Sequence, residues 1–311
     1  MFKFKKTFVI IAACIAAFAM VGCSSKTNGT SDQNPTTGAT SSNNTATTAP
    51  TDSSLSGSIS GSGSSALLPL AQNAADSFMQ KNPNVSITLN AGGSGTGLKQ
   101  VSDGSVDIGN SDVPAEAKLE AAQASALVDH KVCAITMATI VNNDVAATVK
   151  SLTKQQLIDI FTAKTTNWKD VGGPDEPVVL VTRPTTSGTR ALYQQYALDG
   201  NEEASNASLE TDDSGALLQT VSGQKGAIGY VALSYLVNNT GVSALAIDGV
   251  APTIENTYNG TYPVWGYEHM YTKGEAAGAI KAYIDYVTSD EYSSQLEAQG
   301  YNVTAKMTTT R

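Results

Sequence analysis

Residues 85–112 read VSITLNAGGSGTGLKQVSDGSVDIGNSD. A run of strand-forming residues comes first, a loop of Gly, Ser and Thr follows it, and then come a helical pattern and a second strand-like run, VDIGNSD. The same order of strand, loop and helix occurs at residues 58–82 and at residues 177–198. Strands that alternate with helices through short loops predict an α/β fold with mainly parallel sheets.

The other two units place their loops in the same way. In the first unit Ser64 or Ser65 is the candidate N-cap of the helix. In the third unit we expect a strand at Val178–Val181 and a helix from Thr189 onward. Ligands of open α/β sheets bind beyond the carboxyl ends of the strands, and all of these loops lie there.

The N-terminal region predicts export. Residues 1–22 combine a cationic start with a short apolar run, which is typical of a signal peptide. The small residues before Cys23 resemble the lipobox at which bacterial lipoproteins are cut and acylated, so Cys23 is the candidate lipidation site; a plain secretory signal is the alternative. Residues 23–56 are rich in Ser, Thr, Asn and Gly and predict a disordered tether. We therefore expect a lipid-anchored protein on the extracytoplasmic face of the cell membrane.

Charge and cysteine content narrow the possible partners. Cleavage after residue 22 removes three Lys and no acid, and changes the formal net charge from −9 to −12. Such an acidic chain is not expected to bind nucleic acid or an anionic lipid surface. Cys133 would be the one unmodified cysteine of the mature chain, so it cannot form an internal disulfide, and we expect it in the core.

The three loops are suited to an oxyanion. The N-terminus of a helix carries unpaired N–H groups and partial positive charge, so a Gly/Ser/Thr loop can bind an anion without a Lys. The chain holds only three Arg, and one of them, Arg183, follows a predicted strand directly, where its guanidinium could bind a tetrahedral anion; Arg190 fits a surface arginine. Asp112 is either the N-cap of a following helix or a group that faces the ligand.

Other chemistries fit the chain poorly. A phosphate loop of the Walker type fails because Leu98 stands where its Lys should be, and Lys99 comes one place late. The stretch GSGSSA at 61–66 is only a weak match to a dinucleotide loop. His130 and His269 do not form a zinc-ligand pair, and no GxSxG nucleophile motif occurs. We expect no catalytic residue, no metal site and no cofactor.

Five motifs together resemble the phosphate-binding proteins of bacterial phosphate ABC transporters, the PstS family. They are GSGSSALLPL, GGSGTGLKQVSDGSVDIGNSD, RPTTSGT, GAIGYV and WGYEHMYTK, and they occur in this order between residues 57 and 305. The resemblance implies a type II periplasmic-binding-protein fold, in which two α/β lobes are joined by two crossovers and enclose the ligand. It implies a first lobe at 57–135, a second lobe at 136–264 and a return to the first lobe at 265–311. The crossovers would fall near Ala134–Ile140 and Tyr262–Tyr271.

The resemblance also implies the ligand-binding residues. The family's phosphate contacts fall here on Ser65, Ala66 (through its N–H), Ser94, Asp112, Arg183, Ser187, Gly188 and Thr189. Some members of the family carry an acid two residues after the arginine, where this chain has Thr185, so the sequence leaves open what orients Arg183. Phosphate near neutral pH still carries a proton that Asp112 could accept, whereas sulfate carries none, so Asp112 is the expected specificity element.

The function implied by this resemblance is that of a solute-binding protein and not of an enzyme. It would bind inorganic phosphate as a monomer, close around it by a hinge motion and deliver it to the membrane permease of an ABC transporter. Two alternatives remain open at the level of sequence: a binding protein for another oxyanion such as sulfate or molybdate, and a secreted phosphate-ester hydrolase.

Overall fold

The computed structural model describes residues 55–204 and 208–311. The predicted signal peptide, the candidate lipidation site Cys23 and nearly all of the predicted tether lie outside the described residues. Within the described ranges, no helix combines the length and the hydropathy that a membrane span requires.

The described residues form a mixed sheet of nine strands with helices packed against it. Along the sheet the order is β2-β1-β3-β11-β4-β8-β6-β7, and β9 also pairs with β4. The strands are β1 (Gly57–Gly63), β2 (Val85–Ala91), β3 (Ile108–Ser111), β4 (Leu127–Asn142), β6 (Val179–Thr182), β7 (Ser208–Glu210), β8 (Ala227–Ala232), β9 (Val242–Ala244) and β11 (Trp265–Lys273). A separate two-stranded sheet consists of β5 (Ser151–Leu152) and β10 (Ala246–Ile247).

The helices alternate with the strands along the chain. The α-helices are α1 (Leu68–Lys81), α2 (Ser94–Asp103), α3 (Ala121–Ala124), α4 (Asn143–Ala146), α5 (Lys154–Phe161), α6 (Gly188–Tyr196), α7 (Ser214–Gly223), α8 (Ile254–Tyr258), α9 (Gly278–Val287) and α10 (Asp290–Ser293). Short 3-10 helices are η1 (Ala115–Ala117), η2 (Trp168–Val171), η3 (Leu233–Leu236), η4 (Glu297–Gln299) and η5 (Thr304–Lys306). The predicted α/β class is therefore confirmed.

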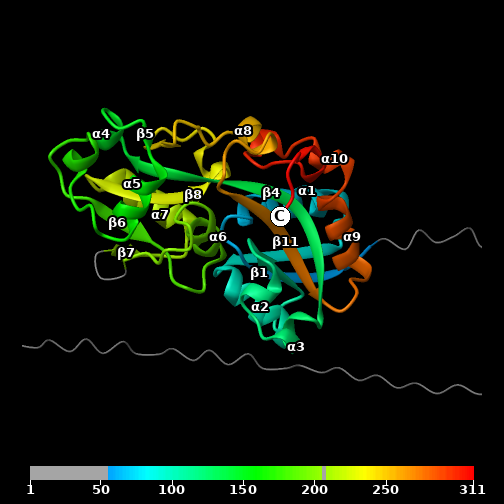
Figure 1. Cartoon of the computed structure of the whole chain (residues 1–311). Helices are drawn as coiled ribbons and strands as arrows, with labels where there is room; N and C mark the ends of the chain where they lie inside the picture. Colours follow the sequence, from blue (N-terminus) through cyan, green and yellow to red (C-terminus); the bar gives the residue numbers. More distant parts are fainter. Residues whose placement is uncertain (1–54, 205–207) are drawn as a thin grey trace, which may run out of the picture. The chain divides into compact units, whose positions relative to one another are not determined.

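The sheet has two halves that share β4. The N-terminal part of β4 pairs with β11, and its C-terminal part, from Met137, pairs with β8. We call β2, β1, β3 and β11 the first half, and β8, β6, β7 and β9 the second half. Figure 1 shows β4 extending through both halves, with β11 beside it. Strands of the predicted strand-loop-helix units pair in parallel, whereas β4 and β11 pair in antiparallel fashion with their neighbours.

The helix starts at the loops differ in how they are capped. Helix α6 begins after Ser187, whose Oγ accepts a hydrogen bond from Arg190 N, so Ser187 is an N-cap. The prediction of Ser64 or Ser65 as the cap of α1 is wrong, because a turn intervenes and the cap residue is Leu67. The hydroxyl of Ser64 instead accepts a hydrogen bond from the N–H of Leu67 and stabilises that turn.

The C-terminal segment packs against α1 and fixes the first loop. Three buried tyrosines donate their hydroxyls to backbone carbonyls there: Tyr283 to Ala71, Tyr292 to Leu70, and Tyr301 to Ala66. Helix α9 also contacts β1. Cys133 on β4 is fully buried, as the sequence predicts.

Candidate functional site

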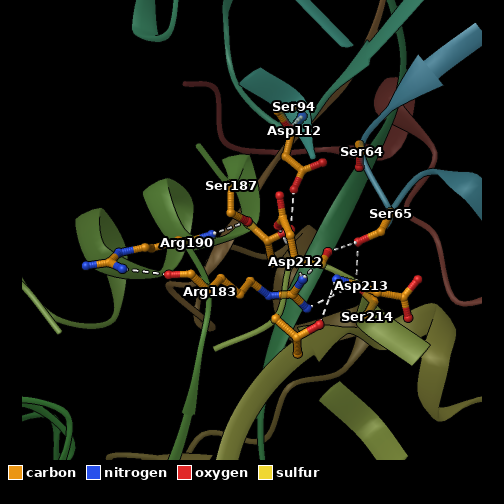
Figure 2. A network of polar contacts seen from close by, with 12 residues as sticks. Ser64, Ser65, Ser94, Asp112, Arg183, Ser187, Arg190, Asp212, Asp213 and Ser214 are labelled. Atoms are coloured by element: carbon orange, nitrogen blue, oxygen red, sulfur yellow. Dashed lines mark hydrogen bonds and ion pairs between the residues drawn. The ribbon is translucent and has the colours of Figure 1, made fainter. Parts of the chain in front are cut away.

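Five loops converge at the carboxyl ends of β1, β2, β3 and β6 and at the start of α7. Figure 2 shows their side chains pointing toward one another, with Ser64 and Ser65 after β1, Ser94 at the start of α2, and Asp112 after β3. Arg183 and Ser187 come from the loop between β6 and α6, and Asp212 and Ser214 come from the start of α7, whereas Asp213 is exposed and caps that helix. The first group belongs to the first half of the sheet and the second group to the second half.

Asp112 lies at the point where the two halves meet. It is 1% exposed, and its Oδ2 accepts a hydrogen bond of 2.5 Å from the hydroxyl of Thr189, which lies across the interface on α6. Its backbone N–H donates to Ser94 Oγ at 3.0 Å. Because η1 has Pro114 as its N-cap residue, Asp112 is not a helix cap and its side chain faces the cluster.

Gly188 must be a glycine in this arrangement. A Cβ built on it would overlap Ser94 Oγ and would come within 3.2 Å of Asp112 Cβ. The starts of α2 and α6 therefore approach each other as closely as their backbones allow. This approach brings two helix N-termini, each with partial positive charge, to one small space.

Arg183 is completely buried and held by the second half. Its Nη1 donates to the carbonyl of Asp212 at 3.1 Å, and its Nη2 donates to Ser214 Oγ at 3.0 Å and to the carbonyl of Tyr230 at 3.2 Å. Asp212 Oδ1 lies 3.9 Å from Nη1. These contacts answer the question that Thr185 leaves open, because Asp212 and Ser214 orient the arginine. Its Nε is buried and has no hydrogen-bond partner among the described residues, so this N–H is an available donor.

Sequence reasoning missed Asp212 and Ser214, although a signal was present. Residues 211–216 read TDDSGA, another stretch of small polar residues that leads into a helix. Ser65 contacts this loop directly, since its Oγ donates to the carbonyl of Asp212 at 2.9 Å and lies 2.9 Å from Ser214 Oγ. Tyr235 in turn donates its hydroxyl to the carbonyl of Ser65 at 2.6 Å.

Backbone contacts also join the two halves around the cluster. The N–H of Gly95 donates to the carbonyl of Thr186 at 3.1 Å. The ammonium of Lys118 donates to the carbonyls of Thr185 at 2.8 Å and Ser187 at 3.1 Å. Lys118 is half-buried, and burial lowers its pKa from the usual value. The arrangement is a closed one, in which the loops of both halves cover the cluster.

Arg190 is not the surface residue that the sequence predicts. It is 8% exposed, its Nη1 donates to the carbonyl of Arg183, and its Nε lies 3.7 Å from a carboxyl oxygen of Glu203. Burial raises the pKa of Glu203 to about 7, against the lowering effect of the charge of Arg190. The arginine therefore supports the loop of Arg183 from behind.

Burial also raises the pKa of Asp212, while a hydrogen bond with Ser187 and the charge of Arg183 act in the opposite direction. The cluster thus combines two arginines, two aspartates and several hydroxyl groups in a space with little contact with solvent. Such a site favours a small anion that offers both acceptors and a proton.

Several residues considered from the sequence lie outside this cluster. Lys99 is exposed on α2, and His269 is paired with Asp129 through Nδ1 at 2.8 Å. His130 contacts Thr272 at 3.0 Å. Among the residues that the structure describes, no group of three or more His, Cys, Asp and Glu side chains is arranged to hold a metal ion.

Comparison with known proteins identifies the family to which the chain belongs. Residues 38–291 match the family described as the PBP superfamily domain. The phosphate-binding protein PstS of Bacillus subtilis strain 168 is 44% identical over 308 residues, which cover 99% of this chain and 97% of that protein. The chain belongs to the PstS family. Among other PstS-family relatives, the protein SphX of Synechococcus elongatus is 28% identical over 246 residues, 73% of this chain and 72% of SphX.

Solved structures agree with the fold of this PstS-family chain. A substrate-binding protein of the phosphate ABC transporter type from Clostridium perfringens, crystallised with bound phosphate, has a TM-score of 0.72 and 33% identity, and the match covers 79% of this chain and 99% of that chain. An ABC-type phosphate transport receptor from Vibrio cholerae has a TM-score of 0.62 at 23% identity and covers 79% of this chain and 100% of that chain, a likeness of fold alone. The predicted type II periplasmic-binding-protein fold is confirmed.

Proposed function

We propose that this PstS-family chain is a solute-binding protein that encloses inorganic phosphate between the two halves of its sheet and delivers it to the permease of an ABC transporter. The Bacillus subtilis relative is a phosphate-binding protein, and the Clostridium perfringens neighbour was solved with phosphate bound. The single observation that carries the proposal is the convergence of Arg183, Ser65, Ser94 and Thr189 around Asp112 in a buried cluster.

The chemistry of the cluster matches a protonated tetrahedral oxyanion. The buried guanidinium of Arg183 supplies positive charge, and its unpaired Nε–H is one available donor. The hydroxyl of Ser94, the N–H groups at the starts of α2 and α6, including that of Gly188, and the N–H of Ala66 before α1 supply further donors. The hydroxyl of Ser65 would join them by turning from the carbonyl of Asp212 to the ligand. Asp112 supplies the acceptor that the proton of phosphate requires and that sulfate cannot use.

The division into lobes belongs to the same proposal. We assign the first lobe to 57–135 and 265–311 and the second lobe to 136–264, so that β4 and the segment before β11 are the crossovers. The change of partner of β4 near Met137 and the hydrogen bond from its N–H to the carbonyl of Val264, 2.9 Å long, support this assignment. Opening at these two segments would release the ligand.

The ligand itself can be identified without prior assumption. Protein purified under conditions that preserve bound ligands should carry inorganic phosphate, which mass spectrometry of the native complex detects as a mass increment that disappears after denaturation. Sulfate, molybdate or a phosphorylated metabolite in its place would contradict the proposal.

We further propose that the chain is a monomeric receptor without enzymatic activity, anchored by lipid on Cys23 after removal of residues 1–22. A chromogenic phosphate ester should not be turned over above the rate without protein, and measurable turnover would favour the hydrolase alternative. Cys23→Ser should release the protein from the membrane fraction into the medium, and unchanged membrane association would rule out anchoring at this residue.

A further inference from the structure

A second buried carboxyl group lies next to the proposed phosphate site. Glu268 is on β11, at a bulge of the strand, opposite Cys133 of β4. The residue is 0% exposed. No hydroxyl, amide, ammonium or guanidinium group of the described residues donates a hydrogen bond to either of its carboxyl oxygens. The motif WGYEHMYTK contributes this residue, and the proposed function leaves it without a role.

The surroundings of Glu268 oppose a negative charge. Cys133 on β4, Tyr301 before η5 and Asp112 after β3 interact electrostatically with Glu268, and each of these groups is neutral or negatively charged. Burial raises the pKa of Glu268 well above its usual value, and the charge of Asp112 raises it further. A carboxyl group in such a place keeps its proton, because an unpaired buried charge costs several kcal/mol.

Asp112 and Glu268 lie next to each other, because the residues beside them, Ser111 and His269, are register partners in the antiparallel pair of β3 and β11, and the charge of Asp112 acts on Glu268. Two ionised carboxylates cannot hydrogen bond to each other, so a hydrogen bond between these two groups requires a proton on one of them. Asp112 Oδ2 already accepts from Thr189, whereas Asp112 Oδ1 is buried and has no hydrogen-bond donor among the residues that the structure describes. A proton on Glu268 provides the missing donor for Oδ1 and satisfies both groups.

We propose that Glu268 is a positioning residue, which donates its proton to Asp112 Oδ1 and so keeps Asp112 as an ionised acceptor toward the ligand. The inference rests on the proposed function, because it assigns the means by which phosphate is distinguished from sulfate. The pair then carries one negative charge, not two, beside an anionic ligand. If the proton were on Asp112 instead, Asp112 could donate to sulfate, and the discrimination between the two anions would be lost.

The environment of the two groups determines where the proton lies. Asp112 has the hydroxyl of Thr189 as a donor, and Lys118, whose charge acts on Asp112 and Asp212, is close by. Glu268 is completely buried, and no side chain of the described residues donates a hydrogen bond to its carboxyl oxygens. A hydrogen-bond donor favours the charged form of a carboxyl group, and burial without such a donor favours the neutral form, so we place the proton on Glu268.

The proton can be detected directly in the ligand-free protein. Infrared spectra near neutral pH should contain the carbonyl band of a buried protonated carboxylic acid, absent in Glu268→Gln and shifted in Asp112→Asn, which changes its hydrogen-bond partner. A spectrum of Glu268→Gln identical to that of the wild type would overturn the proposal. This measurement does not depend on phosphate binding, so a failure of the proposed function would be seen separately.

The effect on selectivity separates positioning from a structural role. Glu268→Gln keeps an N–H donor for Asp112, so the ratio of sulfate to phosphate dissociation constants, measured by calorimetry, should stay within about threefold of the wild type. Glu268→Met removes the donor, and Asp112 then gains a tendency to take up a proton, so the ratio should fall roughly tenfold or more. The control Thr272→Val, a buried change on the same strand away from Asp112, should not alter the ratio. An unchanged ratio in Glu268→Met, or an equal fall in Glu268→Gln, would contradict the proposal.

Discussion

At the scale of single residues, the hydroxyl of Ser94 tests the loop at the start of α2. Ser94 is 1% exposed, and its Oγ accepts from the N–H of Asp112. Ser94→Ala should weaken phosphate binding about tenfold in calorimetry, because one hydrogen bond to a charged ligand is lost. Lys99→Ala, an exposed change on the same helix, is the matched control and should leave the affinity unchanged. Unchanged phosphate affinity in Ser94→Ala would contradict a role for this loop in binding the ligand.

Glu203 gives the stability a predictable pH dependence. Its pKa in the folded protein is about 7 against a usual value of 4.5, because it is buried. The folded state therefore holds one more proton than the unfolded state between these two values, and the free energy of unfolding falls as pH rises from the lower value to the higher. In Glu203→Gln this side chain no longer titrates, so the fall in the free energy of unfolding with rising pH should be smaller by up to about 3 kcal/mol. Denaturant unfolding at a series of pH values measures it, and parallel curves for wild type and variant would contradict the assignment.

At the scale of elements, the site depends on how closely α2 and α6 approach. Gly188→Ala should prevent closure, since its Cβ would overlap Ser94 Oγ, and we expect phosphate affinity to fall by about a hundredfold or more. Gly223→Ala at the end of α7 is the matched control, because a Cβ there meets nothing within 4 Å, and it should bind phosphate as the wild type does. Small-angle scattering with phosphate should show compaction in the control and not in Gly188→Ala. Normal affinity of Gly188→Ala would show that the two helices do not need to meet.

The strand-loop-helix elements could be predicted because their signals are local. Apolar periodicity and small polar loops predicted the segments from β1 to α1, from β2 to β3 and from β6 to α6. The observed elements lie close to the predicted positions. The start of α1 was predicted wrongly because a serine hydroxyl can accept a backbone hydrogen bond in a turn as well as at a helix N-cap, and Ser64 does so in a turn. The antiparallel pairing of β4 with β11 could not be read from local sequence, since the two segments are far apart in the chain.

The residues of the candidate site were predicted only in part, because some of them are brought together by contacts that local sequence does not reveal. The loop residues from Ser65 to Thr189 lie in one buried cluster, but their ligand contacts stay a prediction. Arg190 was misjudged because its burial depends on Glu203, 13 positions later in the sequence and paired at 3.7 Å. Asp212 and Ser214 were missed because no charge pattern links them to Arg183 until the chain folds.

At the scale of the whole molecule, an acidic chain with a formal net charge of −9 is proposed to capture an anion. The average field of such a chain repels phosphate, so attraction must come from local donors in the cluster where the two halves meet. This requirement explains why the donors come from both halves and why Arg183 is fully buried. We attribute the discrimination between similar anions to Asp112, the buried carboxylate at the point where the two halves meet.

The most direct test of the account is calorimetry with phosphate and sulfate on the wild type and on Asp112→Asn. The wild type should bind phosphate and discriminate against sulfate by roughly four orders of magnitude, since sulfate brings no proton to the buried carboxylate of Asp112 and is repelled by its charge. In Asp112→Asn the discrimination should largely disappear, because the amide can donate to either anion. Equal discrimination in both proteins, or a wild type that does not bind phosphate, would contradict the central claim.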